Sequence, residues 1–497
     1  MEPPPLTSPA ESPVVANGAA ARHLDRPPRY NLLIIGGGSA GVAAALEAAR
    51  WGATTALVEP RQLGGYRVTH GEVPRTALLA AARAAHQIRT SSKFGMDVES
   101  LDIEFAKVAK HVRAARQAAA ARVRDELPLG LDVIEGAARF IGPDCVQVGQ
   151  RTLRFHRALI ATGSTSVSLE VPGLASEDRT TESRVYDWDE LPRRLIVLGA
   201  SAIACELAQA LRRLGSEVHL VDPAETLLPG ELPDATQFVR SQFEREGIFL
   251  HLGWTPRQVE RTGAAKSLTL QRSTNRLKLI ADEILVITER RPAVADLAIE
   301  AAGLRADDAG VQVDDWLRTS NHAIYAAGSV CGREHAGQAD YFARIAVQNA
   351  LLVRHRRAAG AALIRYTCTD PPVAKIGMSP REAGASGLVI RVQRHDFDTA
   401  CDERAAGSLE GFLELYTVAG ADRIVGAVIV GSGARELAWL ISAAINHRLG
   451  LKKLAGLPLP ASGPVAALLT LAQRLAVERR SPAVDRWLNK WQAWRRS

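Results

Sequence analysis

A glycine-rich loop after a short apolar segment is the first place where residue types and spacing suggest a chemistry. Residues 31–35 read NLLII, and the loop 36–41, GGGSAG, follows directly before a helical pattern over 42–50. A second apolar segment, 54–58, ends in Glu59, about 20 positions after the loop. This order predicts a β-α-β unit that binds a dinucleotide, because it places a G-x-G-x-x-G loop between a strand and a helix and an acidic residue at the end of the second strand.

Each residue type in this loop has a physical role. Gly36 permits a tight turn, Gly38 lets a pyrophosphate approach the backbone, and Gly41 allows the helix to pack closely on the strand. The N-terminus of the helix that follows stabilises the phosphates, Ser39 lies within the loop, and Glu59 is placed to bind ribose hydroxyls. We therefore expect these five residues to bind a dinucleotide.

The same pattern returns, less completely, over residues 195–222. There the loop begins at Gly199, and Ser201 and Ala204 replace the second and third glycines, so every position remains small. Asp222 ends the second strand without an arginine directly after it, which favours NADH over NADPH. The alternative is a nucleotide-binding fold that has lost its ligand.

The segment 64–79, GGYRVTHGEVPRTALL, resembles the redox loop of the class I pyridine nucleotide-disulfide oxidoreductases, which include mercuric reductase and dihydrolipoamide dehydrogenase. The family pattern is GG-x-C-x4-C-x-P-S-K-A-L-L. In this chain Arg67 and Glu72 stand at the two cysteine positions, and Thr76 stands at the lysine position. The G-x-S-x-x-A form of the second loop resembles mercuric reductases in particular. The resemblance covers about residues 30 to 480.

This resemblance implies an α/β fold with two Rossmann-like dinucleotide-binding domains, one for FAD and one for NAD(P), and a C-terminal α+β dimerisation domain. The expected divisions follow from where the motifs lie. They are a disordered leader (1–28), an FAD-binding domain (29–178 and 296–363), an NAD(P)-binding domain (179–295), a dimerisation domain (364–480) and a basic, tryptophan-rich tail helix (481–497).

The resemblance also assigns further residues to the cofactors. For FAD these are Gly65, the A-T-G turn with Thr162 and Gly163, and the strand end at Gly328 and Ser329, where the family has aspartate in place of the serine.

Glu206, in the run CELAQA, matches the glutamate that lies near the nicotinamide. Its usual lysine partner would stand at Thr76. Arg75 is a neighbouring cation, but one residue along a helix is a turn of ~100°, so we expect it to be a poor substitute.

A second part of the thiol chemistry is missing near the C-terminus. The family's H-P-x-P-T-x-x-E motif supplies a histidine–glutamate pair to the partner chain, and here its first and last positions are Leu457 and Pro464. That histidine is the acid–base group for thiol exchange. Cysteines and histidine are therefore absent together, which indicates loss of the dithiol half-reaction.

Without a dithiol, reduced flavin would pass electrons directly to an external acceptor such as a quinone, oxygen, a dye or a metal complex. We expect Arg67, His70 and Glu72 to line that side of the flavin and, with Glu206, to form the catalytic set. Arg67 and Glu72 are candidates for an ion pair where the disulfide was. His70 is either a proton donor to a quinone or a solvent-exposed loop histidine. The second hypothesis is a non-catalytic relative that keeps the fold for binding or regulation, which the changed cofactor positions favour.

Bulk properties exclude several other classes. The formal charge is +7 and the pI about 9.3, but the arginines are scattered, so nucleic-acid binding has little support. No apolar run approaches the ~20 residues that a membrane span needs. The five cysteines show no C-x2-C or C-x4-C spacing, which argues against zinc and fits a reducing cytoplasm. We expect a cytoplasmic homodimer.

The tail carries Trp487, Trp491 and Trp494 at helical spacing, surrounded by cations at 486, 490, 495 and 496. One interpretation is an interfacial helix on an anionic membrane, with the tryptophans at headgroup depth. The other is a helix that packs its aromatic stripe on the body of the dimer.

Overall fold

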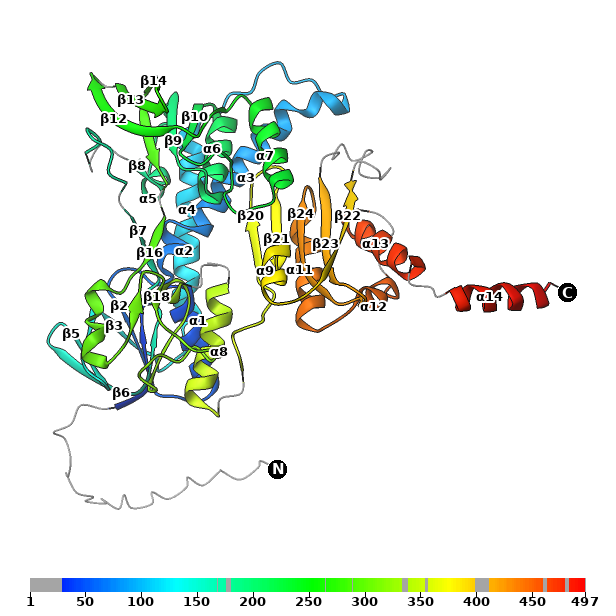
Figure 1. Ribbon diagram of the computed structural model, residues 1–497. Helices are drawn as coiled ribbons and strands as arrows, with labels where there is room; N and C mark the ends of the chain where they lie inside the picture. The colour runs from blue at the N-terminus through cyan, green and yellow to red at the C-terminus, as the bar shows by residue number, and fades with distance from the viewer. Residues whose placement is uncertain are drawn as a thin grey trace, which may run out of the picture.

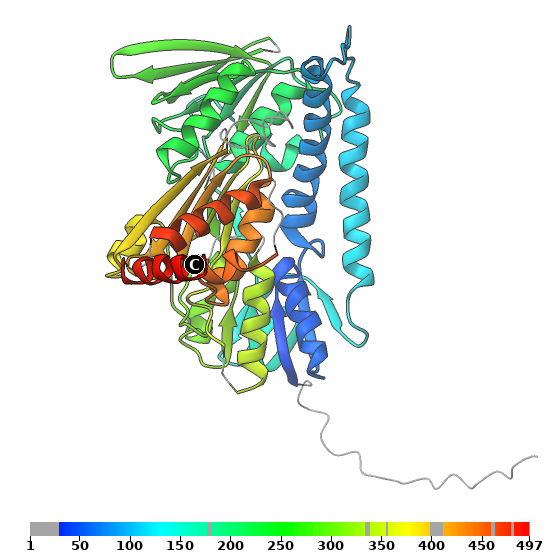
Figure 2. The ribbon, with the colours of Figure 1, turned by 90° about the vertical axis from the view of Figure 1, so that its right-hand side faces the viewer.

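The computed structural model describes residues 29–167, 169–175, 180–263, 265–287, 289–332, 338–353, 356–397, 411–458, 463–478 and 482–496. Two units lie one above the other, one built on a mixed, mainly parallel sheet and one on a parallel sheet, and a domain with an antiparallel sheet stands beside them (Figure 1). The long helices α3 (Glu72–Arg89) and α4 (Phe105–Asp125) run side by side along both parallel-sheet units (Figure 2). The leader, residues 1–28, lies outside the described residues.

The first unit, at the bottom of Figure 1, has the strand order β3-β2-β1-β6-β5-β4, and β19 adds to β6. Strand β1 pairs in parallel with β2 and β6. Alternate residues of β1 enter two different cores: Leu32 and Ile34 face α1 and α8, whereas Leu33 and Ile35 face β4 and β5. Burial on both faces explains why this strand is apolar throughout.

The elements of this unit are β1 (Arg29–Ile35), α1 (Ser39–Arg50), β2 (Thr55–Glu59), α2 (Gly65–Thr69), η1 (Ser91–Phe94), β3 (Asp132–Glu135), β4 (Ala138–Gly142), β5 (Cys145–Val148), β6 (Arg151–Ile160), η2 (Ala295–Leu297), η3 (Ile299–Ala302), β17 (Ala306–Asp307), β18 (Gly310–Val311), β19 (Ile324–Ala326), η4 (Ser329–Cys331) and α8 (Ala339–Leu351).

The second unit has the parallel order β11-β10-β9-β15-β8. Helix α6 packs its apolar side on one face of this sheet, and the antiparallel sheet β12-β13-β14 covers the other face. Ser201 caps α6 by accepting a hydrogen bond from the amide of Ala204, and Gly215 ends the helix with φ of 128°.

Its elements are β8 (Thr180–Thr181), α5 (Glu182–Val185), β9 (Arg194–Leu198), α6 (Ala202–Leu214), β10 (Glu217–Asp222), α7 (Pro233–Arg245), β11 (Phe249–Leu252), β12 (Thr255–Thr262), β13 (Ala265–Arg272), β14 (Asn275–Ala281) and β15 (Glu283–Val286). Between the two units, β7 (Ser164–Ser166) and β16 (Arg290–Pro292) form an antiparallel ribbon.

The third domain has an antiparallel sheet in the order β20-β21-β24-β23-β22. Helices α11, α12 and α13 bury one face of it. Residues of the other face, including Phe412 and Tyr416, join the core of the second unit. Residues 411–416 alternate between apolar and polar types and residues 424–431 are apolar, which is a pattern typical of paired strands. The structure has them as the antiparallel neighbours β23 and β24.

The elements of this domain are β20 (Ile364–Thr367), β21 (Val373–Gly377), α9 (Pro380–Ala385), β22 (Ile390–Asp396), β23 (Phe412–Val418), β24 (Ile424–Val430), α11 (Ala434–Asn446), α12 (Leu451–Ala455) and α13 (Pro464–Glu478).

The predicted tail helix is present as α14 (Pro482–Trp494). It extends away from the rest of the molecule beyond α13 (Figure 1). Within the part of the chain that the structure describes, no helix is long and apolar enough to cross a membrane.

Candidate functional site

The first glycine-rich loop lies at the carboxyl end of β1 and leads into α1, which begins at Ser39. Gly36 has φ of 106°, and a Cβ there would lie 2.4 Å from the carbonyl oxygen of Ala161. A Cβ at Gly41 would lie 1.8 Å from the carbonyl oxygen of Gly36. A Cβ at Gly38 would meet no atom within 4 Å. Two glycines are therefore required by the fold, and the third leaves open space before a helix N-terminus, which suits a phosphate group.

Glu59, at the end of β2, holds this loop in place. Its Oε2 accepts a hydrogen bond from the amide of Gly37 (2.6 Å), and its Oε1 accepts one from the amide of Arg61 (3.0 Å). Each carboxylate oxygen keeps a further lone pair for a ribose hydroxyl. Gly65 packs directly on the loop, since a Cβ there would lie 2.7 Å from the Cα of Gly38.

The remaining residues predicted for FAD lie at the same edge of the sheet, where β6 and β19 end next to β1. Thr162 donates a hydrogen bond from Oγ1 to the carbonyl oxygen of Ala293 (2.8 Å), and Gly163 follows it with φ of 73°. Gly328 has φ of 85° and precedes Ser329, which opens η4. The open cradle at Gly38 and this convergence fit a flavin dinucleotide.

The second glycine-rich loop repeats the arrangement more tightly. A Cβ at Gly199 would lie 2.6 Å from the carbonyl oxygen of Ile287. Asp222 accepts hydrogen bonds from the amides of Ala200 (2.7 Å) and Ala224 (2.6 Å). This carboxylate orders the loop as Glu59 orders the first one, which suits a dinucleotide with an unphosphorylated ribose.

Arg67 and Glu72, at the two positions assigned to cysteines, form the ion pair that the sequence suggested. Arg67 Nε lies 3.3 Å from Glu72 Oε2, and Arg67 Nη1 lies 3.7 Å from Asp340 Oδ2 on α8. Both Arg67 and Glu72 are about half exposed, so the pair contributes little to stability (about 0–1 kcal/mol). Its effect on the site is to place a cation where a dithiol would stand.

His70 ends α2 and is half-buried, so its interpretation as a solvent-exposed loop histidine is wrong. Its Nδ1 lies 2.9 Å from Thr69 Oγ1. Burial and the nearby charge of Arg116 lower the pKa of His70 from its usual value, because both disfavour the imidazolium. Both effects favour the neutral imidazole.

The expectation that Arg75 would be a poor partner for Glu206 is wrong. Arg75 Nε lies 2.8 Å from Glu206 Oε2, and the amide of Cys368 donates to Glu206 Oε1 (2.6 Å). Thr76, at the lysine position, is exposed. The argument from the helical turn considered only the direction of the Cα–Cβ bond. The long arginine side chain compensates for the rotation, since α3 packs closely against α6.

Three more residues join this buried cluster, and the sequence singled out none of them for a role. Arg75 Nη1 lies 3.2 Å from Glu182 Oε1, and the Tyr66 hydroxyl donates to Glu182 Oε2. The guanidinium of Arg290 stacks over the Tyr66 ring, 3.9 Å from its centroid. Glu182 lies on the short helix α5, where no motif marked it. The cluster therefore joins α3 of the first unit to α5 and α6 of the second.

Burial governs the electrostatics of the cluster. It raises the pKa of Glu206 and of Glu182, and the charge of Arg75 opposes this rise in both. For Arg75, burial lowers the pKa, but Glu206 and other neighbours outweigh it and raise the pKa overall. The cluster is thus a desolvated arrangement in which one cation serves two carboxylates.

A cleft of about 180 Å³ lies between α1, α2, α4 and α8. Its walls include Ser39, Gly64 and the apolar side chains of residues 42, 43, 46, 68 and 123. Charged side chains complete the lining, namely Glu47, Arg50, Arg67, Glu126, Asp340 and Arg344. Burial raises the pKa of Asp340, and its Oδ1 is buried without a hydrogen-bond partner among the described residues. The cleft thus extends from Ser39, at the start of α1, to Arg67 on α2.

Leu457 and Pro464, which stand at the histidine and glutamate positions of the family motif, are described, but the segment between them is described only in part. Leu457 is exposed and Pro464 begins α13, but most of the segment between them, 459–462, lies outside the described residues. Cys331, the lone cysteine near the expected flavin, is half-buried and donates from Sγ to the carbonyl oxygen of Gly328 (3.1 Å).

Comparison with known proteins agrees with the fold. Residues 30–350 match the pyridine nucleotide-disulphide oxidoreductase family, and residues 364–460 match the dimerisation domain of that family. The chain is 29% identical to a mercuric reductase of Staphylococcus aureus over 452 residues, which is 90% of this chain and 81% of the relative. It is 28% identical to a dihydrolipoyl dehydrogenase of the same species over 441 residues, or 87% and 93% of the two chains. The crystal structure of LpdA from Mycobacterium tuberculosis superposes with a TM-score of 0.82 at 25% identity, over 89% of this chain and 99% of that one.

Proposed function

Because the chain belongs to the pyridine nucleotide-disulphide oxidoreductase family, we propose that it is an FAD-dependent NAD(P)H oxidoreductase that reduces an external acceptor directly from its flavin. The members of this family are flavoproteins with the α/β fold described above. The finer assignment is that NADH is the preferred donor and that no redox disulfide takes part. The main support for electron transfer without a disulfide is the Arg67–Glu72 ion pair at the cysteine positions. A buried pair joins Arg75 of α3 to Glu206 of α6.

The cofactor-binding residues supply orientation and charge. The backbone of the loop 36–41 and the N-terminus of α1 would hold the FAD phosphates, and Glu59 would hold the ribose. Thr162 and Ser329 stand at the sheet edge where the ribityl chain is expected. Bound FAD supplies the chemistry of accepting a hydride from the nicotinamide and holding two electrons.

Glu206 and Arg75 serve the nicotinamide side of the site. Glu206 Oε1 accepts a hydrogen bond from the amide of Cys368, and Oε2 lies 2.8 Å from Arg75 Nε in an ion pair that forms no aligned hydrogen bond. The carboxylate is therefore fixed in place, which suits a group that orients the nicotinamide rather than one that transfers a proton. Asp222 holds the second loop and its negative charge opposes a 2′-phosphate, which supports NADH as donor.

The opposite side of the loop serves the acceptor. The cleft has an apolar wall suited to a ring, and Arg67 offers a cation to a negatively charged reduced product. Asp340 lies in the same wall, where burial raises the pKa of its carboxyl group and the charge of Arg67 opposes this rise. His70 is half-buried at the end of α2, where burial lowers its pKa. These features favour a quinone or a similar ring compound as acceptor.

The two half-reactions can be measured separately by rapid mixing without air. Glu206→Ala should slow flavin reduction by NADH at least about tenfold and leave reoxidation by a quinone near the parent rate. Arg67→Ala should do the reverse. The matched control is Arg122→Ala, which removes an exposed cation of α4 and should change neither rate. If both variants slow the same half-reaction, the assignment of the two sides is wrong.

The second candidate is a non-catalytic relative. Ser201 and Ser329 favour it, because positions that face the cofactors have changed as well as those of the dithiol. A purified protein without flavin absorbance, or one whose flavin does not bleach with NADH, would support this candidate. For either candidate we propose a cytoplasmic homodimer, since the match to the dimerisation domain supports self-association.

A further inference from the structure

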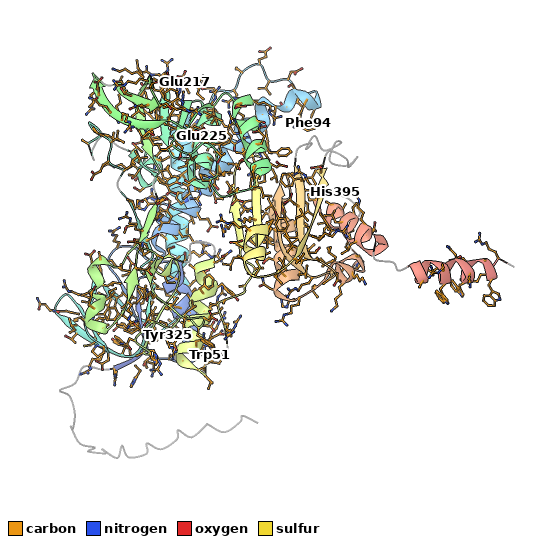
Figure 3. The ribbon with its side chains drawn as sticks, viewed as in Figure 1. Trp51, Phe94, Glu217, Glu225, Tyr325 and His395 are labelled. Atoms are coloured by element: carbon orange, nitrogen blue, oxygen red, sulfur yellow. The ribbon has the colours of Figure 1, made fainter. Side chains whose placement is uncertain are left out.

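The tail helix α14 lies outside the residues that match the family, and the proposed enzyme function does not use it. Its three tryptophans are exposed by 61% (Trp487), 37% (Trp491) and 72% (Trp494). Figure 3 shows the side chains of this helix projecting outward, away from the rest of the ribbon. Soluble proteins rarely leave several large aromatic side chains together in water unless they contact another surface.

The tryptophans share one side of the helix. At about 100° per residue, positions 487, 491 and 494 fall within about 60° of one another around the axis. The rings of Trp487 and Trp491 stack with an interplanar angle of 5° and a centroid separation of 6.0 Å. The stripe is therefore an ordered aromatic surface about two turns long.

The cations are arranged around this stripe. By the same helical geometry, Lys490 and Arg495 lie on its two flanks, about 70° from its centre on either side. The guanidinium of Arg495 lies 4.9 Å from the centroid of the Trp491 ring. Residues 482–496 contain four cations and one acid, Asp485. Aromatic rings between two rows of cations match the headgroup region of an anionic bilayer, where indoles sit at the interface and cations reach lipid phosphates.

A second copy of the chain would suit this face less well. In a two-fold contact between identical stripes, the flanking Lys490 and Arg495 of one copy would meet the same cations of the other. Like charges across such a contact repel, whereas anionic lipid neutralises both flanks. The formal charge of +7 on the whole chain adds to this preference. We propose that α14 is an interfacial helix that attaches the protein to the surface of anionic membranes through Trp487, Trp491 and Trp494, flanked by Lys490 and Arg495.

The test uses the full chain and vesicles of phosphatidylcholine, with or without phosphatidylglycerol, in a flotation assay. The protein should float with the anionic vesicles and stay behind with the neutral ones, and binding should weaken as salt rises. Lipids with brominated acyl chains should quench part of the tryptophan emission. Equal binding to both vesicle types, or none to either, would overturn the proposal.

Variants distinguish membrane binding through α14 from membrane binding through the overall positive charge of the chain. Replacing all three tail tryptophans with alanine should abolish flotation, and the pair Lys490→Glu and Arg495→Glu should weaken it at least about tenfold. The matched controls are Trp51→Phe, at the end of α1 (Figure 3), and the pair Lys107→Glu and Arg122→Glu on exposed positions of α4. These should bind as the parent does. The proposal fails if the controls lose as much binding as the tail variants.

Light scattering tests whether α14 contacts a second copy of the chain instead of lipid. If α14 joins two copies, the triple tryptophan variant changes the molar mass in solution, and that result would contradict attachment to lipid. An unchanged mass with lost flotation supports it.

Discussion

The buried cluster around Arg75 gives the sharpest stability prediction. Replacing Arg75 with methionine keeps most of the side-chain volume but leaves Glu206 and Glu182 without their shared cation. Their side chains are only 3% and 9% exposed, so water cannot replace the lost charge. Removing one partner of a buried ion pair typically costs about 3–5 kcal/mol, so Arg75→Met should destabilise the protein by this amount at pH 7.

The cost should depend on pH in a defined direction. Burial already raises the pKa of Glu206 and Glu182, and loss of Arg75 raises both further. A carboxyl group with a raised folded-state pKa favours the folded state at low pH, and this contribution is lost as pH rises from the unfolded pKa through the folded one. The stability difference between parent and variant should therefore be small near pH 4 and widen toward pH 8.

The assay is urea or thermal unfolding followed by circular dichroism across this pH range, with Arg67→Met as the matched control. Arg67 also pairs with two carboxylates, but its pair with Glu72 is about half exposed on both sides. This control should lose less than about 1 kcal/mol. Its pH dependence should be smaller than that of Arg75→Met, because only one of its partners, Asp340, has a carboxyl group with a raised pKa. If the two variants lose similar stability, or if the loss for Arg75→Met does not grow with pH, the reasoning about the buried cluster is refuted.

The remaining expected outcomes concern the two cofactor loops, the substrates and the oligomeric state. Gly41→Ala should destabilise the first unit, because its Cβ would lie 1.8 Å from a carbonyl oxygen, whereas Gly38→Ala should fold normally and lose FAD affinity; calorimetry of apo and loaded protein checks both. Asp222→Ala should reduce the preference for NADH over NADPH about tenfold in kcat/KM, and an unchanged ratio would contradict its proposed role. Turnover should be absent with lipoamide, glutathione disulfide and mercuric ion, and activity on any of the three would count against the account. The mass from light scattering should be that of a dimer, and a monomer would contradict the proposed dimerisation.

The sequence predicts the local framework of the site well, because that framework depends on local patterns. The loop 36–41 could be assigned from its glycines, since steric fit at Gly36 and Gly41 leaves no other choice. The Arg67–Glu72 pair could be predicted because both residues replace groups that would bond to each other. The strands β23 and β24 were recognisable from their alternation and apolar content.

The buried cluster could not be predicted in the same way. Arg75 was discounted because the direction of its Cα–Cβ bond was considered without the reach of its guanidinium. Glu182 and Arg290 lie more than 100 residues from Tyr66 in the chain, and only the packing of the two units brings them together. The periodicity of the tail helix likewise predicts its aromatic stripe, but it does not predict which surface that stripe contacts.

The most direct measurement of the central claim is an anaerobic titration that counts electrons. A flavin accepts two electrons, and a flavin with an adjacent redox disulfide accepts four. With Arg67 and Glu72 at the cysteine positions, one equivalent of dithionite per flavin should bleach the flavin band completely, and quinone should restore it. A requirement for two equivalents per flavin would show that a second two-electron centre is present, and would contradict direct transfer from the flavin.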